Sequence, residues 1–459
     1  MAPVHFDRRM TDAEGLMWRL EKDPYLSSTF SNLTILDRPI DIDRFRRRME
    51  IAAMVVPRLH QRVQSMPANL APPVWVDDPS FDIDYHVRHV ALPKPGTMRQ
   101  LADVAMLIAA DPFDRTRPLW EFVVIDGLRG GKGALVQKMH HTVADGEGSI
   151  RLSMQFLDLE RDAPGPEPVD APSGTAPVGP SGLETIRDFM AGGMRLPIAM
   201  LGQVKELLAE PANIPRAGVA VVETIRGIAS QLSDTEQARS PLWRERSLRR
   251  HLEMIRVPME RTRDAAKALG GTLNTAFVTA AAAAAGAYHR ELGAPVDHLR
   301  ASMAISTRTS SSGSNAFSIA RLLVPTSDMP FADRFQIIAS ATTGARATSA
   351  TASLETLAKV ASTLPTSLVS RLARQQSQTV DFATSNVRAA NFPCFIGGAL
   401  VLQNHPIGPL AGVAFNLTMM SYCGSLDLGL NTDAASIEEP ALLASLLTKA
   451  FDELHATAG

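Results

Sequence analysis

The sequence predicts an α+β fold in which mixed sheets are covered by helices. Strand-like and helix-like segments alternate along the 459 residues, but they do not form regular βαβ units. A proline-rich stretch at residues 161–182 (RDAPGPEPVDAPSGTAPVGPSG) cannot bury a core, so we expect it to be an exposed linker. The expected organisation is therefore an N-terminal domain at 1–160, the linker at 161–182, bridging helices at 183–240 and a C-terminal domain at 241–459.

The first half is predicted to contain helices and a pair of strands. Thr11 and Glu14 form a capping box at the start of the first helix. Apolar residues at helical spacing predict a second helix at 41–63. The segments 120–126 (WEFVVID) and 134–140 (ALVQKMH) are expected to be strands joined by a glycine-containing turn.

The second half shows the same mixture of elements. A helix at 258–269 is expected to end at a pair of glycines, and a new helix is expected at 272–292. The segments 415–420 and 426–430 are predicted to be strands because the later one alternates leucine with small or polar residues. Leucines at helical spacing predict a last amphipathic helix around 443–454.

Composition and charge exclude several kinds of partner. The 46 basic and 48 acidic residues nearly cancel, so no nucleic-acid partner is expected. The dense arginines at 44–48 and 244–250 fit solvated surfaces, with an anion site as the alternative. Two distant cysteines, Cys394 and Cys423, give neither a disulfide framework nor a zinc cluster, and no metal or other cofactor is expected. This cysteine usage fits a reducing cytoplasm.

The membrane relationship follows from the apolar segments. The polar start of the chain does not resemble a secretory signal, and the alanine-rich stretch at 276–288 is too short to span a bilayer. We therefore expect a cytoplasmic protein. The amphipathic segment 183–209 is expected to be a bridging helix, and peripheral contact with a membrane or lipid droplet is the alternative.

The most informative segment is HHTVADG at residues 140–146, which follows a predicted strand. Adjacent strand residues point to opposite faces, so only one of His140 and His141 can face a reaction site while the other packs into the structure. Imidazole can take a proton from an attacking alcohol at neutral pH and return it to a leaving thiolate. Acyl transfer from a thioester to an alcohol therefore needs one such histidine and no covalent nucleophile. A G-x-S-x-G nucleophile elbow is absent from the sequence.

This heptapeptide matches the H-H-x-x-x-D-G motif of an acyltransferase superfamily that includes chloramphenicol acetyltransferase and peptide-synthetase condensation domains. Over nearly its full length, the chain resembles the bacterial wax ester synthase/diacylglycerol acyltransferase family. The similar segments are 10–20 (MTDAEGLMWRL), 118–120 (PLW), 385–387 (SNV) and 415–430 (FNLTMMSYCGSLDLGL).

The resemblance implies two chloramphenicol-acetyltransferase-like domains with the active-site channel between them. It also implies acyl-CoA as the donor and diacylglycerol or a long-chain alcohol as the acceptor, with no cofactor besides the acyl-CoA substrate. Within the motif His141 would be the catalytic base, with His140 and Gly146 beside it and Asp145 mainly structural.

Three further residues are carried over by position. Asn274 matches an asparagine that the family links to activity, but the family has an aspartate where this chain has Thr275. Asn274 could instead satisfy backbone groups at a helix N-terminus. Ser385 and Asn386 are candidate substrate-binding residues, with a turn role as the alternative.

Two other functions stay open on the sequence alone. The same histidine chemistry would serve an acyltransferase or condensation enzyme that takes its acyl group from a carrier-protein thioester. The loss of the aspartate after Asn274 would also suit a non-catalytic lipid-binding relative, although a pure binder would not need the histidine motif. Pro118, Trp120, His86 and His89 are expected to be structural.

Overall fold

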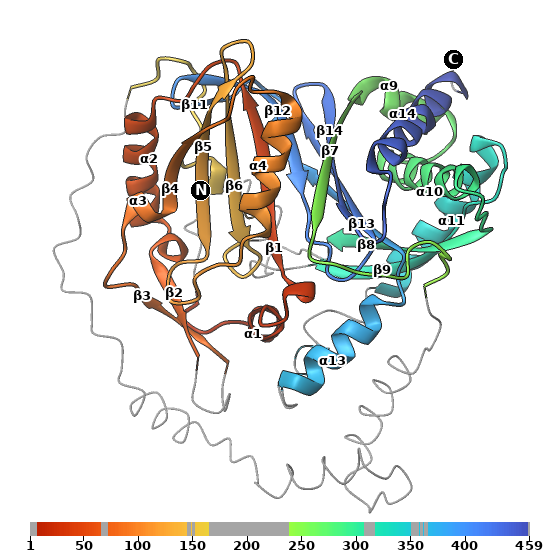
Figure 1. Cartoon of the computed structure of the whole chain (residues 1–459), viewed down its shortest axis with the longest axis horizontal. Helices are drawn as coiled ribbons and strands as arrows, with labels where there is room; N and C mark the ends of the chain where they lie inside the picture. Colours follow the sequence, from red (N-terminus) through yellow and green to blue (C-terminus); the bar gives the residue numbers. More distant parts are fainter. Residues whose placement is uncertain are drawn as a thin grey trace, which may run out of the picture.

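The structure is a computed structural model that describes residues 7–65, 72–144, 148, 152–164, 238–306, 317–349, 358, 361 and 366–457. Two halves lie side by side, and each is built around a six-stranded mixed sheet (Figure 1). This arrangement confirms the predicted α+β class with helices covering mixed sheets. The predicted linker at 161–182 and bridging helices at 183–240 lie almost entirely outside the described residues.

The first sheet has the strand order β11-β12-β1-β6-β5-β4. Neighbouring strands are antiparallel except for the parallel pair β4 and β5. The strands are β1 (Thr29–Leu36), β4 (Val87–Ala91), β5 (Trp120–Leu128), β6 (Lys132–His140), β11 (Phe395–Ile396) and β12 (Ala399–Ile407). A separate hairpin-like pair consists of β2 (Gln61–Gln64) and β3 (Val74–Asp77).

Helices cover both faces of the first sheet because its side chains alternate between two apolar clusters. One cluster joins Phe45 of α2 (Ile42–Val55) and the partly buried Ile83 of α3 (Ile83–His86) to Phe122 of β5. The other joins Leu101 of α4 (Met98–Ala110) to Val123, which is the next residue on the same strand. This switch of faces between adjacent residues is the period of two that a strand imposes.

The second sheet has the strand order β7-β14-β13-β10-β8-β9. The strands are β7 (Arg250–Pro258), β8 (His298–Ser306), β9 (Phe317–Pro325), β10 (Phe382–Arg388), β13 (Phe415–Tyr422) and β14 (Ser425–Asp433). Its helical layer consists of α9 (Met259–Ala268), α10 (Leu273–Glu291), α11 (Phe331–Ser349) and α14 (Pro440–Thr457). The alanine-rich α10 is buried along most of its length, which explains why small side chains predominate there.

The second half of the chain also contributes to the first sheet. β11 and β12, which belong to the range predicted as the C-terminal domain, complete the first sheet next to β1. β12 also lies against β14, where an added Cβ on Gly429 would come within 1.8 Å of the Pro406 carbonyl oxygen. Only glycine permits so close an approach of the two backbones.

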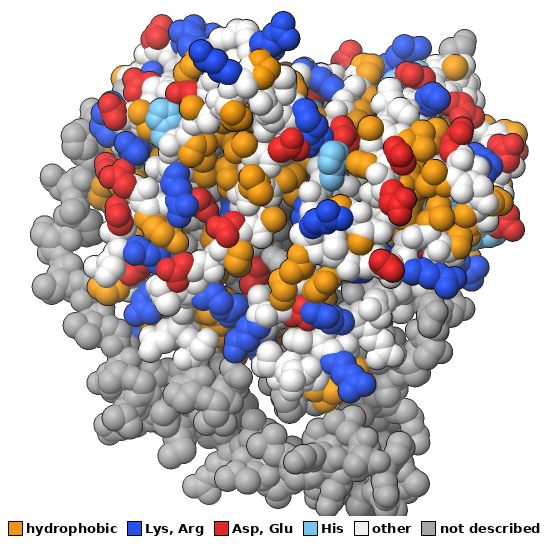
Figure 2. Space-filling view, in the orientation of Figure 1, with side chains coloured by type: hydrophobic (Ala, Val, Ile, Leu, Met, Phe, Trp, Pro, Cys, Tyr) orange, Lys and Arg blue, Asp and Glu red, His pale blue; other side chains and the backbone are white. Residues whose placement is uncertain are grey.

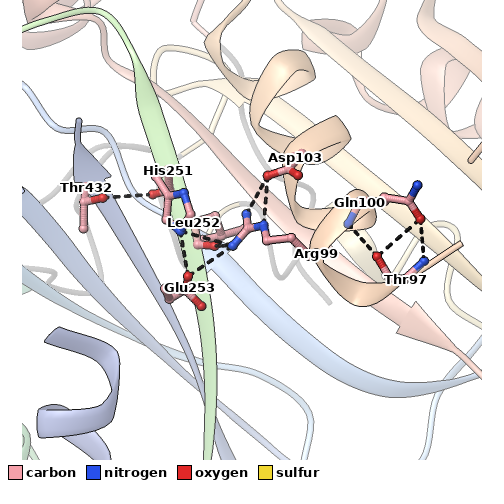
Figure 3. Close-up of polar contacts among 8 residues, drawn as sticks. All are labelled: Thr97, Arg99, Gln100, Asp103, His251, Leu252, Glu253 and Thr432. Carbon is pink, nitrogen blue, oxygen red and sulfur yellow. Dashed lines mark hydrogen bonds and ion pairs between the residues drawn. The ribbon is translucent and has the colours of Figure 1, made fainter. Parts of the chain in front are cut away.

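A polar bridge joins α4 of the first half to β7 of the second (Figure 3). The Arg99 guanidinium donates to the Leu252 carbonyl at 2.9 Å and to the Glu253 carboxylate at 3.1 Å, and it also pairs with Asp103 of its own helix. Leu252 packs in the same apolar cluster as the α4 side chains. A second connection is the ion pair between Arg374 of α13 (Thr366–Ser377) and Asp23, just after α1 (Asp12–Leu20).

Most predicted elements are confirmed, with small differences in their ends. Thr11 caps α1 with the expected capping box, and Thr272 caps α10. The helix predicted at 41–63 is wrong beyond Val55, because Pro57 follows. The residue before a proline is forced out of helical geometry, and Val56 has φ −109° and ψ 100°.

No single helix among the described residues is long and apolar enough to cross a membrane, although α9 and α10, bent by 93° at their junction, would pass if counted together. Figure 2 shows acidic and basic side chains interspersed over both halves of the visible face, as expected from the nearly balanced charge.

Candidate active site

The candidate active site begins where β6 ends, at His140 and His141. Neighbouring strands hold the backbone of this pair on both sides. The amide of His140 donates to the Leu119 carbonyl at 3.0 Å, and the amide of His141 donates to the Ser28 carbonyl at 3.1 Å. The PLW segment is therefore next to the histidines, and Trp120 is fully buried there with its indole N–H bonded to the Leu59 carbonyl.

The ring of His140 is packed into the structure. Its side chain is fully buried, and both ring nitrogens are engaged by protein groups. Nδ1 lies 2.8 Å from Thr142 Oγ1, and Nε2 lies 3.1 Å from a carboxylate oxygen of Glu21. The prediction that one histidine of the pair packs into the structure is confirmed.

Glu21, which caps the C-terminal end of α1, organises the loop that enters β1. Its carboxylate accepts hydrogen bonds from the Ser28 amide at 2.6 Å, the Ser27 hydroxyl at 2.6 Å and the Thr29 hydroxyl at 3.2 Å. Burial alone would raise the pKa of Glu21, but His140 and the serine donors lower it to about 2. The carboxylate therefore stays ionised and anchors His140.

The ring of His141 has a different neighbour from that of His140. Its half-buried ring is 4.6 Å from the ring of Phe30, measured between centroids, with the two planes tilted by 45°. Burial lowers the pKa of His141 to about 4, and the neighbouring His140 lowers it further while Glu21 opposes the shift. The imidazole is therefore neutral at pH 7, which is the form that can accept a proton.

An apolar pocket lies directly beyond Phe30. Phe30 of β1 and Met139 of β6 form one wall, and another is formed by Ser153, Met154, Phe156 and Leu157. The remaining walls come from the second half of the chain, including Ala389, Val401 and Met420. His141 does not line this pocket itself and is linked to it through the ring of Phe30. The cavity volume is about 70 Å³, so its apolar lining suits a segment of an alkyl chain.

Asn274 lies in the first turn of α10, above the second sheet. Its Nδ2 donates to the sulfur of Met303 at 3.0 Å, and Met303 is in register with Thr384 on β10. Thr275 is buried, and its hydroxyl lies 2.9 Å from that of the N-cap residue Thr272.

Ser385 and Asn386 follow on β10, where they pair with Thr418 and Met419 of the parallel strand β13. Ser385 is half-buried and Asn386 is exposed. Ala389, three residues further along, lines the same pocket as Phe30. The end of β10 and the His141 region therefore meet at one pocket, although no hydrogen bond or ion pair joins Ser385 or Asn386 to His141 within the described residues.

The other predicted residues have plain outcomes. His86 is buried, stacks on Trp120 with centroids 4.6 Å apart and bonds through Nδ1 to the Trp120 carbonyl, while His89 pairs with Asp126. These contacts fit the structural roles predicted for both histidines. Asp145 and Gly146 lie outside the described residues. The described parts of the chain contain no group of three His, Cys, Asp or Glu side chains placed to hold a metal ion.

Comparison with known proteins gives a consistent result. Residues 10–277 match the wax ester synthase/diacylglycerol acyltransferase catalytic domain, and residues 313–455 match the C-terminal domain of the same family. The chain belongs to the wax ester synthase/diacylglycerol acyltransferase family. It is therefore an acyltransferase of lipid metabolism by family, as the sequence resemblance predicts.

Relatives and solved structures agree with this family. A Mycobacterium tuberculosis protein named for diacylglycerol O-acyltransferase activity is 33% identical over 474 residues, covering 98% of this chain and 93% of the relative. The wax ester synthase/diacylglycerol acyltransferase from Marinobacter aquaeolei VT8 shares the fold with a TM-score of 0.66 and 22% identity, covering 98% of this chain and 100% of that one. The trichothecene 15-O-acetyltransferase TRI3 from Fusarium sporotrichioides has a TM-score of 0.64 at 10% identity, covering 98% and 94%.

Sequence reasoning missed Glu21 and Phe30 in this acyltransferase. Glu21 is separated from His140 by 119 positions, so no local pattern links the two residues. Phe30 faces Met139 across the β1–β6 pair, and this register could have pointed to it once the two strands were known to pair.

Proposed function

We propose that this protein transfers a long-chain acyl group directly from acyl-CoA to the hydroxyl of a diacylglycerol or long-chain alcohol, with His141 as the general base. The observation that carries the proposal is the neutral imidazole of His141 in contact with Phe30, whose ring lines an apolar pocket shared by both halves of the chain. Family membership and the named relatives support this substrate class.

The chemistry needs one base and one ordered encounter of the substrates. His141 takes the proton of the acceptor hydroxyl as its oxygen attacks the thioester carbonyl carbon. The tetrahedral intermediate then collapses, the carbon–sulfur bond breaks, and the protonated imidazole gives its proton to the leaving thiolate. The products are the ester and free CoA, and the imidazole returns to its neutral form.

Burial of His141 has two effects on this step. It keeps the ring unprotonated, and it places the developing charge in a medium where nearby dipoles act strongly. The charge of Glu21 partly opposes the lowering of the His141 pKa and so favours the imidazolium that forms during the reaction. In this proposal, the His140–Glu21 pair is a positioning unit that fixes the backbone on which His141 is carried.

Asn274 is the candidate donor from the second half of the chain. In our proposal its amide N–H stabilises the oxyanion of the tetrahedral intermediate, a role that preorganised amides commonly have in acyl transfer. Its present hydrogen bond to the Met303 sulfur is a weak one that a carbonyl oxygen would displace. Ser385 and Asn386 are the proposed substrate-binding residues at the end of β10.

The test is a panel of acyl-CoA esters crossed with long-chain alcohols and diacylglycerol, with release of free CoA thiol and formation of the ester measured together. Stoichiometric thiol and ester support direct transfer. Thiol release without ester would instead indicate hydrolysis, and tight acyl-CoA binding without either product would indicate a lipid-binding protein. Palmitoyl-CoA is also compared with a palmitoyl carrier-protein thioester, because faster transfer from the carrier would reassign the donor.

A further inference from the structure

Three amide side chains form a polar strip inside the apolar pocket that Phe30 lines. Asn32 of β1, Gln137 of β6 and Asn404 of β12 all line this pocket, which is otherwise mainly apolar. Asn404 is buried, and the other two are half-buried. We call Asn32, Gln137 and Asn404 the amide strip.

Hydrogen bonds to Thr34, which is fully buried, hold the strip in place. Asn32 Nδ2 donates to Thr34 Oγ1 and to Asn404 Oδ1, each at 3.0 Å. The Thr34 hydroxyl donates to Asn404 Oδ1 at 2.8 Å, and Gln137 Nε2 donates to Thr34 Oγ1 at 3.1 Å. The amide of Asn404 is further fixed because its backbone N–H donates to the buried Asp427 carboxylate at 2.7 Å.

This network leaves three side-chain groups of the strip without protein partners among the described residues: Asn32 Oδ1, Gln137 Oε1 and Asn404 Nδ2. Asn32 Oδ1 is buried and has no hydrogen-bond partner. Asn404 uses its side-chain oxygen in the network, whereas its Nδ2 forms no hydrogen bond. Buried polar groups in native proteins are almost always paired, so the buried Asn32 acceptor needs a partner. With the open Asn404 donor lining the same pocket, it points to a ligand that both donates and accepts.

Strand register places the strip at a fixed distance from the reacting centre. Phe30 faces Met139 across the β1–β6 pair, and Asn32 faces Gln137 one step further along. Since His141 contacts Phe30, a chain that runs along this face from His141 passes the Phe30–Met139 pair first and then reaches the strip. At about 3.3 Å per residue, the four residues from His141 to Gln137 span roughly 13 Å.

We infer that the amide strip recognises a hydroxyl group partway along the alkyl chain of a lipid substrate. A hydroxyl both donates and accepts, so it satisfies Asn32 Oδ1 and Asn404 Nδ2 together, whereas a ketone or ester oxygen only accepts. An unsubstituted chain would bury these polar groups without giving them a hydrogen-bond partner. Burying unpaired polar groups costs binding free energy, so the site should reject the unsubstituted lipid. The inference rests on the proposed function in that the pocket holds a substrate alkyl chain.

The hydroxyl could belong to the acyl donor or to the acceptor, and the experiment separates these sources. One arm compares an unsubstituted long-chain acyl-CoA with the mid-chain-hydroxylated acyl-CoA of equal length, each with a plain alcohol. The other arm gives the plain acyl-CoA either a plain alcohol or a diol with its second hydroxyl in mid-chain. Dissociation constants and kcat/KM are measured in both arms.

We expect at least about a tenfold preference for the hydroxylated lipid in one arm, and the arm that shows it identifies the substrate. Asn404→Leu and Asn32→Leu should reduce this preference to near equality. Met420→Leu, which changes an apolar wall of the same pocket, should keep the preference ratio. Thermal unfolding is recorded for each variant, and the wild-type comparison stands even if a variant fails to fold.

Equal binding and turnover of plain and hydroxylated lipids in both arms would overturn the inference while leaving acyl transfer intact. Selective binding of a hydroxylated lipid without any ester product would support the inference and refute the proposed transfer. If Asn404→Leu weakens binding of CoA alone as much as binding of acyl-CoA, the amides of the CoA arm occupy the strip and the inference is wrong.

Discussion

The two halves of the molecule hold their candidate site residues in different ways. In the first half, His140 is buried and bonded through both ring nitrogens, and the Glu21 carboxylate accepts from several donors besides. In the second half, Asn274 is bonded to a sulfur, and within the described residues Ser385 and Asn386 form no side-chain hydrogen bond. The difference suggests a preset base in one half and contacts in the other half that form only with substrate.

The largest expected effect in this comparison comes from the base itself. His141→Ala should lower kcat by up to about 10⁴-fold, since it removes the proton acceptor for the attacking alcohol. The melting temperature should change little because the backbone bonds of His141 remain. His298→Ala, an exposed histidine in the second half, is the matched control and should keep wild-type turnover. Substantial activity in His141→Ala would refute the general-base role.

Removing the Glu21 carboxylate, which holds His140 in the first half, should have the next largest effect. Glu21→Ala leaves the buried His140 and the Ser28 amide without their acceptor and should cost roughly 1–3 kcal/mol of unfolding free energy for each donor left unsatisfied. We also expect a lower kcat, because the loop that supports His141 would shift. Glu260→Ala is the control, since Glu260 is exposed and forms only a long ion pair with Arg263. Chemical denaturation of both variants measures the difference, and equal stabilities would contradict the anchoring role.

A smaller loss of activity is expected when the candidate donor of the second half, Asn274, is removed. Asn274→Ala should lower kcat by about 10²-fold with little change in KM, because an oxyanion donor acts mainly in the transition state. Met303→Leu removes the sulfur that Asn274 contacts but keeps the amide, so it should have little effect. A rise in KM with unchanged kcat would reassign Asn274 to substrate binding.

The smallest expected change is the response of turnover to mild acid. The pKa of His141 is lowered from the usual value of about 6.5 to about 4, so kcat/KM should stay level as pH falls from about 8 to 5.

The stability of the fold should respond differently to the same change of pH. Above pH 6.5, His141 is neutral in both the folded and the unfolded protein. Between pH 6.5 and 4, the unfolded chain binds a proton at His141 that the folded chain does not, so the free energy of unfolding falls as pH falls.

His86 and His405, whose pKa values are also lowered to about 4 by burial, contribute with the same sign. The melting temperature should therefore fall with pH below about 6.5 while the folded enzyme keeps its rate. Activity assays over this pH range, with calorimetry at the same pH values, would show both effects. A fall of kcat/KM with an apparent pKa near 6.5 would mean that His141 is not the base.

The features that could be predicted from the sequence are those set by residues close together in the chain. The capping box at Thr11, the strand before His140 and the packing of one of the two adjacent histidines follow from neighbouring residues, and the structure confirms them. Contacts between residues far apart in the sequence could not be predicted in this way. Thr34 and Asn404 are separated by 370 positions, and nothing in either segment shows that β1 and β12 pair. The same limit hid Glu21 from the predicted site.

The insertion of β12 beside β1 also bears on how the protein can be assembled and divided. A fragment that contains only the first half would expose the backbone groups of β1 that β12 normally covers, and such an open edge invites pairing with other chains. The two halves should therefore fold as a single cooperative unit. Engineers who exchange halves between relatives would need to move β11 and β12 together with the first half, although these strands are encoded near the other end of the gene.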